Sequence, residues 1–485
     1  MQAEDSVFEF GREFCRLGTH LLVMEDNPGL IRAKMEAAGL SAAAIRAFLF
    51  QYEKLSRKET GLIPEASISP VENLPGLEAD PAKAAELLSK TVVLKLNGGL
   101  GTGMGLEKAK SLLKVRQSLT FLDIIVRQFL LLRDSVAPDL RLLLMNSFST
   151  SSDTATALAS YAALGDPAGL ELLQNKVPKI DAESLEPINW PHNPALEWCP
   201  PGHGDIYPSL LGSGLLDQLL HEGKEYLFVS NSDNLGATLD VRLLGFFARS
   251  QTPFLMEVVT RTAADRKGGH LGCRNRDHRL LLRESAQCPE KDLAYFQDID
   301  RHRYFNTNNL WIRLSALRRE LDRSDGFLPL PLIRNEKTVD PRDNSTPKVY
   351  QLETAMGAAI ECFEGATAIQ VSRDRFAPVK TTSDLLTVRS DAYELDSQFR
   401  LALRPERSGV PPVVKLSDEY KLVDRFEPLI AAGAPSLLRC KSLTVEGKFE
   451  FEPEVEIVGD VKFVSHSPEM KKIGSGSYDN TEILL

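Results

Sequence analysis

A glycine-rich run follows directly on a short apolar stretch in the first quarter of the chain. Residues 95–105 read KLNGGLGTGMG, with five glycines in eight residues, and they come after TVVL. Glycine loses more conformational freedom on folding than any other residue, so a loop of this kind favours a ligand that contacts its backbone. Lys108, Lys110 and Lys114 follow at once. The pattern therefore favours an anionic ligand held by backbone amides and positive charge.

The loop matches neither of the two common phosphate-binding motifs. A Walker loop requires Gly-Lys-Ser/Thr, whereas Gly105 is followed by Leu106. In a dinucleotide fingerprint the third glycine would fall at Met104 or Leu106. A flexible turn with solvated lysines is the simpler interpretation of an isolated glycine run, but a position directly after an apolar strand favours a nucleotide or phosphate site.

The segment EYLFVSNSDN ends in Asp233 and Asn234. A carboxylate at the end of a strand is a common way to hold Mg²⁺ against substrate phosphates. Asp and Asn are equally frequent in turns and at helix caps. Read in isolation, these two residues favour a turn over a metal site.

Three other segments are ambiguous when each is read alone. PPGHGD contains His203, which could donate to a phosphate or cap a turn. FNTNNLW places Asn308 among amides and aromatic residues, which suits sugar hydroxyls or a polar turn. VKTTSD contains Lys380, which could neutralise phosphate charge or lie in solvent. H-E-x-x-H and G-x-S-x-G are both absent, so zinc hydrolysis and serine acyl transfer gain no support.

Taken together, the motifs resemble one family. In order, over roughly residues 92–390, they are LNGGLGTGMG with KAKS, QNKVPKI, EWCPPGHGDIYPSL, SNSDN, RKGGHLG, FNTNNLW, LETAMGAAI and FAPVKTTSDLL. They resemble the eukaryotic-type UTP–glucose-1-phosphate uridylyltransferases, or UDP-glucose pyrophosphorylases. The resemblance implies an α/β fold with a Rossmann-like mixed sheet of the nucleotide-diphospho-sugar transferase type, with helices on both faces. It also implies a helical N-terminal segment and a C-terminal left-handed β-helix.

The same resemblance implies a reaction. UTP and glucose 1-phosphate would form UDP-glucose and pyrophosphate reversibly and with Mg²⁺, by in-line attack of the sugar phosphate on the α-phosphorus of UTP. Such transfers are accelerated mainly by positioning and by fixed positive charge.

The resemblance further assigns roles to individual residues. The residues expected to contact the nucleotide are Leu96, Gly98, Gly99, Gln174 and Gly202. The residues expected to act on the phosphates are Lys110, Lys380 and His203, and Asp233 is the expected Mg²⁺ ligand. The residues expected on the sugar side are Asn234, Asn308 and Glu353. A carboxylate such as that of Glu353 can accept two hydroxyl hydrogen bonds.

One position departs from the family pattern. Many members read Gly-Pro-Lys-Ser where this chain reads Lys-Ala-Lys-Ser at 108–111. The change should alter the stiffness of the loop and adds a second cation, Lys108. Which of Lys108 and Lys110 contacts which phosphate is left open.

Two alternative functions are weighed against this one. The first is a UDP-N-acetylhexosamine or broad-specificity UDP-sugar pyrophosphorylase, against which the match of NTNNLW and LETA to the glucose enzymes argues. The second is a catalytically silent protein that binds UDP-sugar. Loss of Lys110, Asp233 or Lys380 would favour the silent protein, and all three are present.

The elements that must position these residues follow an alternating pattern. TVVLKL, LRLLLMN, EYLFVSN and TPFLMEVVT are apolar runs typical of buried strands. Between the first two, Phe121, Ile125, Phe129 and Leu132 recur at helical spacing. Alternating strands and helices predict an α/β sheet covered on both faces, with ligands at the carboxyl ends of the strands. NGG and SNSDN occupy such ends.

Breaks in composition predict three regions. Residues 1–85 form a helical N-terminal segment that ends in a connector with prolines at 64, 70, 75 and 81, expected to run extended over the surface. Residues 86–400 form the main domain, which the family resemblance implies is the catalytic nucleotidyltransferase domain. Residues 401–485 begin with the proline-containing LALRPERSGVPPVVKL, and the short period-two runs beyond it predict a small β domain.

The composition of the chain limits the classes of partner that it is expected to bind. With 57 Lys and Arg against 67 Asp and Glu, the net charge of −10 argues against nucleic acid. No apolar stretch approaches the ~20 residues of a membrane span, and the acidic start MQAEDSVFEF is unlike a signal peptide. Six scattered cysteines without a C-x-x-C pair predict free thiols in a reducing cytoplasm. The oligomeric state is open.

Overall fold

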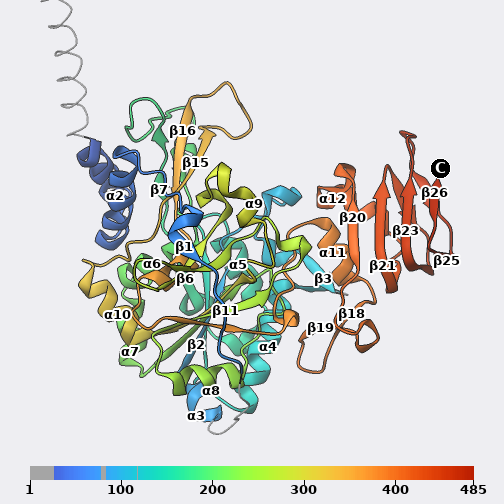
Figure 1. The fold of residues 1–485 in the computed structure, drawn as a ribbon, viewed down its shortest axis with the longest axis horizontal. Coiled ribbons are helices and arrows are strands. Elements are labelled where there is room, and N and C mark those ends of the chain that lie inside the picture. The colour runs from blue at the N-terminus through green and yellow to red at the C-terminus, as the bar shows by residue number, and fades with distance from the viewer. Residues whose placement is uncertain (1–26, 78–83, 117) are drawn as a thin grey trace, which may run out of the picture.

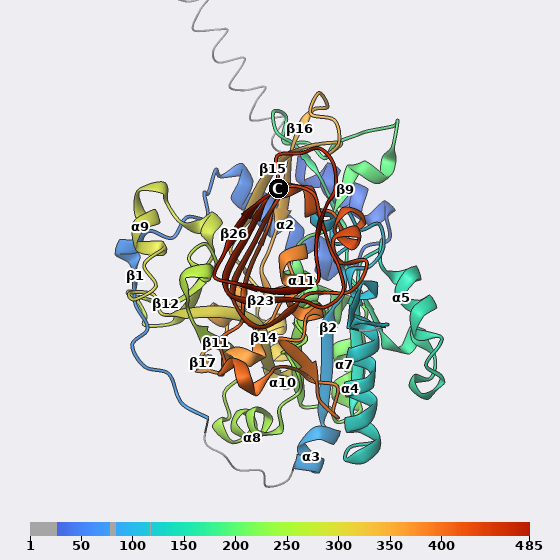
Figure 2. The same cartoon turned by 90° about the vertical axis from the view of Figure 1, so that its right-hand side faces the viewer.

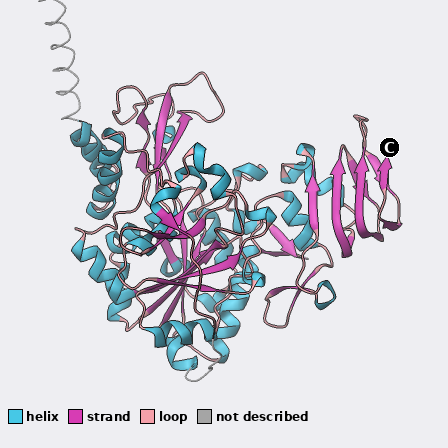
Figure 3. Cartoon of the chain, viewed as in Figure 1, coloured by secondary structure: helices cyan, strands magenta, loops and turns pink. Residues whose placement is uncertain are grey.

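The computed structural model describes residues 27–77, 84–116 and 118–485. Within these residues the largest element is a mixed sheet of ten strands, shown in Figures 1 and 3. Its strand order is β1-β12-β14-β10-β2-β5-β6, with β11 paired to β14 and β17, and β13 paired to β12. The strands are β1 (Ile68–Ser69), β2 (Thr91–Leu96), β5 (Arg141–Asn146), β6 (Glu171–Leu173), β10 (Tyr226–Asn231), β11 (Phe254–Thr260), β12 (His270–Arg274), β13 (Leu280–Arg283), β14 (Tyr304–Arg313) and β17 (Thr367–Gln370).

The centre of the sheet is parallel. β10, β2, β5 and β6 pair parallel in that order, and β14 pairs antiparallel with both β10 and β11. The first five residues of β2 are buried without alternation, as parallel strands covered on both faces require. The parallel order brings the carboxyl ends of β2, β5, β6 and β10 to one edge of the sheet.

Helices cover both faces of this sheet. Val92 and Leu94 of β2 belong to one core, which includes residues of α6 (Ile206–Gly212), α7 (Leu215–His221) and α10 (Leu314–Arg323). Val93 belongs to the opposite core, with residues of α4 (Phe121–Ser135) and α8 (Val241–Ser250). The four predicted strands, the predicted helix and the mixed α/β architecture are confirmed.

Within residues 27–56, which the structure describes, the N-terminal helical region consists of two helices. Helical residues 27–37 end before Gly39, which has a φ of 74°, and α2 (Ala42–Ser56) begins after Ser41. Ser41 caps α2, because its Oγ accepts from Ala44 N at 3.2 Å. One face of α2 packs against a small sheet of β8 (Ile180–Asp181), β15 (Ile333–Thr338) and β16 (Lys348–Glu353).

The connector after α2 is only partly a surface segment. β1 adds an antiparallel edge strand to β12. Glu65 is buried, and its carboxylate accepts from Arg283 Nη1 at 2.7 Å, Arg301 Nε at 2.6 Å and His302 Nε2 at 3.1 Å. The prolines predicted the extended backbone, but the prediction that it runs over the surface is wrong at Glu65, because these three side chains draw the carboxylate inward.

The C-terminal region is a stack of parallel strands. They are β20 (Val413–Leu416), β21 (Ser436–Glu446), β22 (Phe449–Phe451), β23 (Val455–Val464), β24 (Lys471–Ile473), β25 (Gly476–Asp479) and β26 (Glu482–Leu484). All of their pairings are parallel. Figure 1 shows the stack at one end of the molecule, and Figure 2 looks onto it. The β structure expected here is present, although β21 and β23 are eleven and ten residues long, not short.

The prediction of free thiols is tested by the described residues. Cys199, Cys273, Cys288, Cys362 and Cys440 are free thiols, as predicted. Cys15 and the acidic first ten residues lie outside the described residues. None of the helices in the described ranges has the length and apolar character needed to cross a membrane.

Removing the Glu65 carboxylate should destabilise the fold. Arg283 is fully buried, so Glu65→Ala would leave its guanidinium with only the longer ion pair to Asp292 at 3.6 Å, and loss of a buried partner costs up to about 3–5 kcal/mol. We expect a clearly lower midpoint of thermal unfolding by calorimetry. Glu53→Ala, which removes an exposed ion pair with Arg57, is the control and should leave the midpoint almost unchanged. Equal midpoints for the two variants would contradict the structural role of Glu65.

Candidate active site

The predicted site residues gather where the parallel strands end. Leu96 is the last residue of β2, and its carbonyl oxygen accepts from Ser232 N, just after β10, at 3.1 Å. Gln174 follows β6, and its backbone N donates to the carbonyl oxygen of Asn146 at the end of β5, at 2.7 Å. The ends of four neighbouring strands therefore form one edge, as expected for ligand sites in open α/β sheets.

Asp233 lies between two lysines that are distant in sequence. Its Oδ2 accepts from Lys110 Nζ at 2.7 Å and from Lys380 Nζ at 2.8 Å. Burial alone would raise the pKa of Asp233, but the ammonium groups of Lys380 and Lys110 outweigh it and lower the pKa below its usual value. Asp233 is therefore a carboxylate at neutral pH. The structure brings together the predicted metal ligand and both predicted phosphate lysines.

The second oxygen of Asp233 is an acceptor that no described residue satisfies. Among the described residues Oδ1 is buried and has no hydrogen-bond partner, and leaving a buried acceptor unpaired is unfavourable. The described ranges contain no group of three or more His, Cys, Asp or Glu side chains that could hold a metal. A metal here would be held by Asp233 with phosphate oxygens and water, which is the usual coordination of Mg²⁺. These residues fit the predicted ion.

The glycine loop folds back to place Lys110. Gly99 accepts from Lys110 N at 3.0 Å through its carbonyl oxygen. A Cβ at Gly98 would lie 2.9 Å from Gln174 Oε1, so a side chain there would displace the predicted uracil-binding residue. A Cβ at Gly99 would meet nothing within 4 Å. Asp233, Lys110 and Lys380 are together called the ion cluster. The backbone of Gly99, which is bonded to Lys110, therefore faces open space where a ligand can approach it.

Gly202, in the PPGHGD loop, is bonded to the segment that follows β6. Its carbonyl oxygen accepts from Gln174 Nε2 at 2.9 Å. Its φ is 80°, and a Cβ there would lie 2.5 Å from the carbonyl oxygen of Thr354. Both observations require glycine at this position. The predicted nucleotide residues Gly98, Gln174 and Gly202 thus contact one another in a chain.

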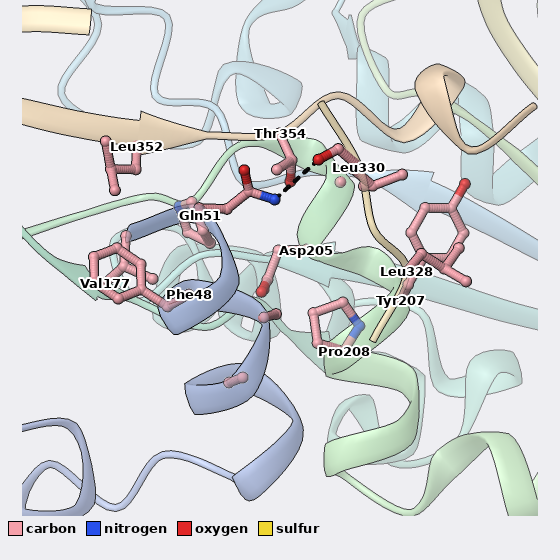
Figure 4. Close-up of a pocket in the computed structure, with 14 residues that line it drawn as sticks. Phe48, Gln51, Val177, Asp205, Tyr207, Pro208, Leu328, Leu330, Leu352 and Thr354 are labelled. Atoms are coloured by element: carbon pink, nitrogen blue, oxygen red, sulfur yellow. Dashed lines mark hydrogen bonds between the residues drawn. The ribbon is translucent and has the colours of Figure 1, made fainter. Parts of the chain in front are cut away.

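Asp205 holds the segment after β6 that contains Gln174. The sequence analysis missed this residue. Its carboxylate accepts from Asn175 N at 2.7 Å and from Ser209 Oγ at 2.7 Å, which fixes the residue after Gln174. Burial raises the pKa of Asp205 to about 6. Figure 4 shows Asp205 beside Phe48 and Gln51 of α2, at a cavity of about 30 Å³. This cavity can hold water but is far too small for a nucleotide.

His203 is held in one tautomer. Its Nδ1 accepts from Met356 N at 3.0 Å, so the ring proton is on Nε2. Met356 begins the short helix η11 (Met356–Glu361). Burial, together with the positive charge of Lys380, lowers the pKa of His203 to about 4. At neutral pH His203 is thus an uncharged donor near Lys380.

Of the predicted sugar-side residues, Asn308 lies at a strand irregularity and Glu353 at a strand end. Asn308 has a φ of 58° and lies at a bulge of β14, where the register with β11 shifts. Its Oδ1 accepts from Asn306 Nδ2 at 2.9 Å. Glu353 ends β16, its Oε1 accepts from Asn335 Nδ2 at 2.9 Å, and burial raises its pKa. The side chain of Glu353 lies next to Gly202.

Asn234 has a different environment. Its Nδ2 donates to the carbonyl oxygen of Arg375 at 3.1 Å, and its Oδ1 accepts from Ala377 N at 3.0 Å. Both ends of the amide therefore hold the segment that leads to Lys380. Direct contact of Asn234 with a sugar stays a prediction.

Two further residues were missed by the sequence analysis. Glu257 lies inside β11 and is fully buried, and Arg375 donates to both of its oxygens, at 2.7 and 2.8 Å. The signal was a single charged residue within the apolar run FLMEVVT, because a charge inside a buried strand requires a partner.

Comparison with known proteins identifies the family. The model of a family described as UTP–glucose-1-phosphate uridylyltransferase matches residues 43–458. The chain belongs to this family. The family member from Solanum tuberosum is 41% identical over 415 residues, which cover 84% of each chain. The family predicted from the motifs is confirmed.

Solved structures agree with this assignment. A mutant of the UDP-glucose pyrophosphorylase from Leishmania major, in complex with UDP-glucose, superposes with a TM-score of 0.90 at 47% identity, covering 95% of this chain and 99% of that chain. The UDP-glucose phosphorylase from Trypanosoma Brucei gives a TM-score of 0.86 at 48% identity over the same shares.

The state of His203 predicts a pH dependence. Its pKa of about 4 lies below the ordinary value near 6.5, so the neutral ring should act at every pH from about 5.5 to 8. His203→Gln, which keeps an N–H donor, should lower kcat/KM by one constant factor across this range. A wild-type to variant ratio that rises tenfold as the pH falls would show that imidazolium is the active form.

The same shift affects stability. Because the folded pKa of His203 is lowered, the unfolded chain binds the proton first, and the free energy of unfolding falls as the pH drops from about 6.5 to 4. His203→Gln should lose less stability in this window, as measured by unfolding midpoints at each pH.

Proposed function

We propose that this chain catalyses the reversible formation of UDP-glucose and pyrophosphate from UTP and glucose 1-phosphate. Membership of the family supports the reaction. The observation at the site that carries the proposal is the Asp233 carboxylate, held between Lys110 and Lys380 with one buried oxygen free. It lies at the edge where the glycine loop offers its backbone.

The glycine loop and the loop that contains Gly202 bind and orient UTP. The backbone of Leu96, Gly98 and Gly99 follows the nucleotide, and Gln174 and Gly202 contact the uracil edge. The contacts among Gly98, Gln174 and Gly202 support this assignment. Because these residues are already held in place, they can position the base without the entropy cost of becoming ordered when UTP binds.

The lysines supply fixed positive charge. An ammonium group has three donors, and Asp233 uses one from each lysine, so both can still donate to phosphate oxygens. His203 adds a neutral donor from Nε2. When bound at Asp233, Mg²⁺ would add charge neutralisation and orientation of the phosphates. The sugar phosphate attacks in line, and the residues stabilise the charge that spreads over the α-phosphate.

The sugar lies on the side of Asn234, Asn308 and Glu353. Asn335 holds one oxygen of Glu353, which orients the carboxylate so that it can accept from two hydroxyls. Asn234 retains acceptor capacity at its Oδ1, which has two lone pairs. Asn308 presents its backbone and amide from the bulge of β14.

We extend the proposal to the finer organisation of the chain. Residues 1–85, 86–400 and 401–485 form the three regions, with a Rossmann-like centre and a left-handed β-helix at the C-terminal end. The parallel order of β6, β5, β2 and β10 supports the first feature, and the parallel pairing of β20, β21 and β23 is consistent with the second. A cytoplasmic location without nucleic acid or membrane partners remains part of the proposal.

The reaction is tested by pyrophosphate release from UTP and Mg²⁺ with a panel of sugar 1-phosphates. We expect turnover with glucose 1-phosphate, and a fall of about 100-fold or more in Lys380→Ala because a charged donor to the phosphates is lost. Lys441→Ala, an exposed lysine of β21, should retain wild-type turnover. Preference for an N-acetylated sugar would overturn the substrate, and binding of UDP-glucose without turnover would indicate the silent protein.

A second variant tests the role of the glycine loop. Because a Cβ at Gly99 meets no protein atom within 4 Å, Gly99→Ala should leave the unfolding midpoint unchanged. It should raise the KM for UTP by about tenfold if the nucleotide contacts this backbone. Gly76→Ala, equally free of neighbours within 4 Å but in the connector, is the control. An unchanged KM in Gly99→Ala would contradict the assignment of Gly99.

A further inference from the structure

The buried carboxylate of Glu257 has an unusually complete set of donors. Besides the two bonds from Arg375, its Oε1 accepts from Trp311 Nε1 at 2.8 Å and its Oε2 accepts from Asn309 Nδ2 at 3.1 Å. Trp311 and Asn309 belong to β14, the neighbour of β11 in the sheet. Glu257 is therefore fixed to the centre of the sheet, and two donors from β14 orient its carboxylate in addition to Arg375.

Arg375 joins this fixed carboxylate to the loop after β10. Its Nε and Nη2 donate to the two oxygens of Glu257, in the bidentate geometry that gives Arg–carboxylate pairs their directional specificity. Nη2 also donates to the carbonyl oxygen of Thr238 at 3.0 Å. Its side chain is 11% exposed, so the guanidinium has one well-defined position.

The backbone after Arg375 is laid along the loop that carries Asp233. The carbonyl oxygen of Arg375 and the N of Ala377 bond to the two ends of the Asn234 amide. Val379 N donates to the carbonyl oxygen of Asp233 at 3.0 Å. Lys380, the next residue, then reaches the side chain of Asp233. The path from Glu257 to Lys380 is therefore continuous.

Lys380 depends on this path more than Lys110 does. The side chain of Lys380 is 56% exposed, whereas that of Lys110 is 13% exposed. Packing thus restrains Lys110, but the position of Lys380 is set mainly by its backbone and its bond to Asp233. Small displacements of a charged group at a reacting centre have large effects on rate.

We propose that Glu257 and Arg375 are positioning residues for the reaction, which hold Lys380 against Asp233. The inference rests on the function proposed above and on the role given there to Lys380. Stability alone does not account for the pair, because replacing a buried ion pair with neutral residues of similar size is often neutral or stabilising.

The test replaces both charges at once with Glu257→Gln and Arg375→Met. No unpaired charge is then left buried, so the unfolding midpoint should stay close to that of the wild type. The new glutamine amide can donate to Asn309 Oδ1, which is buried and without a partner among the described residues. We expect kcat to fall by roughly 10- to 100-fold, with little change in the KM for UTP, because the glycine loop is untouched.

A double-mutant cycle separates positioning from a general structural effect. The double variant Glu257→Gln/Arg375→Met is called the neutral pair. In a Lys380→Ala background the neutral pair should lower kcat by no more than about twofold, because the effects of mutations that act through one group are not additive. A folded neutral pair with wild-type kcat would overturn the inference, and so would an equal loss of kcat in both backgrounds. Should the neutral pair fail to fold, Arg375→Lys, which keeps the charge but loses the bidentate fork, is judged by the same cycle.

A matched pair elsewhere in the sheet controls for the loss of charge. Arg274, at the end of β12, donates to Glu361, at the end of η11, at 2.9 Å and also pairs with Asp277 at 2.8 Å. Burial raises the pKa of Glu361 to about 7, so kcat of this control is compared at pH 8, where Glu361 is mainly ionised. Arg274→Met and Glu361→Gln should together leave kcat unchanged. If Lys380→Ala is fully active, the proposed role of Lys380 fails and the inference fails with it. If Lys380→Ala is inactive while the neutral pair is fully active, the inference alone is overturned.

Discussion

The Asp233 carboxylate between two ammonium groups is the interaction on which the geometry of the site depends. Lys110 and Lys380 would repel each other without it, and one oxygen of Asp233 holds both at hydrogen-bond distance. For this to happen the glycine loop must fold back and the segment after Arg375 must lie along the loop after β10. The glycines, the Asn234 amide and the Glu257–Arg375 pair all serve this one requirement.

The same three loops share a hydrophobic core with the C-terminal stack. Met104 of the glycine loop, Leu235 beside Asn234 and Val379 beside Lys380 are buried in one hydrophobic core. That core continues through the C-terminal strands, where Leu443 and Phe463 belong to it. Each loop therefore has polar residues at the ion cluster and an apolar residue in this core. Burial of the apolar residue helps to hold the polar residues of the same loop in place.

The sequence predicted the features that depend on local pattern. Apolar runs located the central strands, and the polar residues after them located the site, because the ends of parallel strands must meet. The motifs added the family and with it Lys110, Asp233 and Lys380. Features that depend on long-range pairing were not predictable: the burial of Glu65, the amide of Asn234 held at both ends, and the bond of Glu257 to Arg375. Each depends on strand register or on a chain reversal that no local pattern reveals.

The charges of the site suggest why the histidine is neutral. Asp233 cancels one of the two lysine charges, so the three residues leave one positive charge in excess, and an imidazolium beside Lys380 would add a second. That second charge would attract pyrophosphate and UTP equally. Such uniform binding lowers KM without raising kcat. In the proposed reaction, a neutral donor from His203 would contribute direction without charge, and a cation bound at the free oxygen of Asp233 would neutralise the phosphates further. Such a site would stabilise the spreading charge of the transition state and could still release its anionic product.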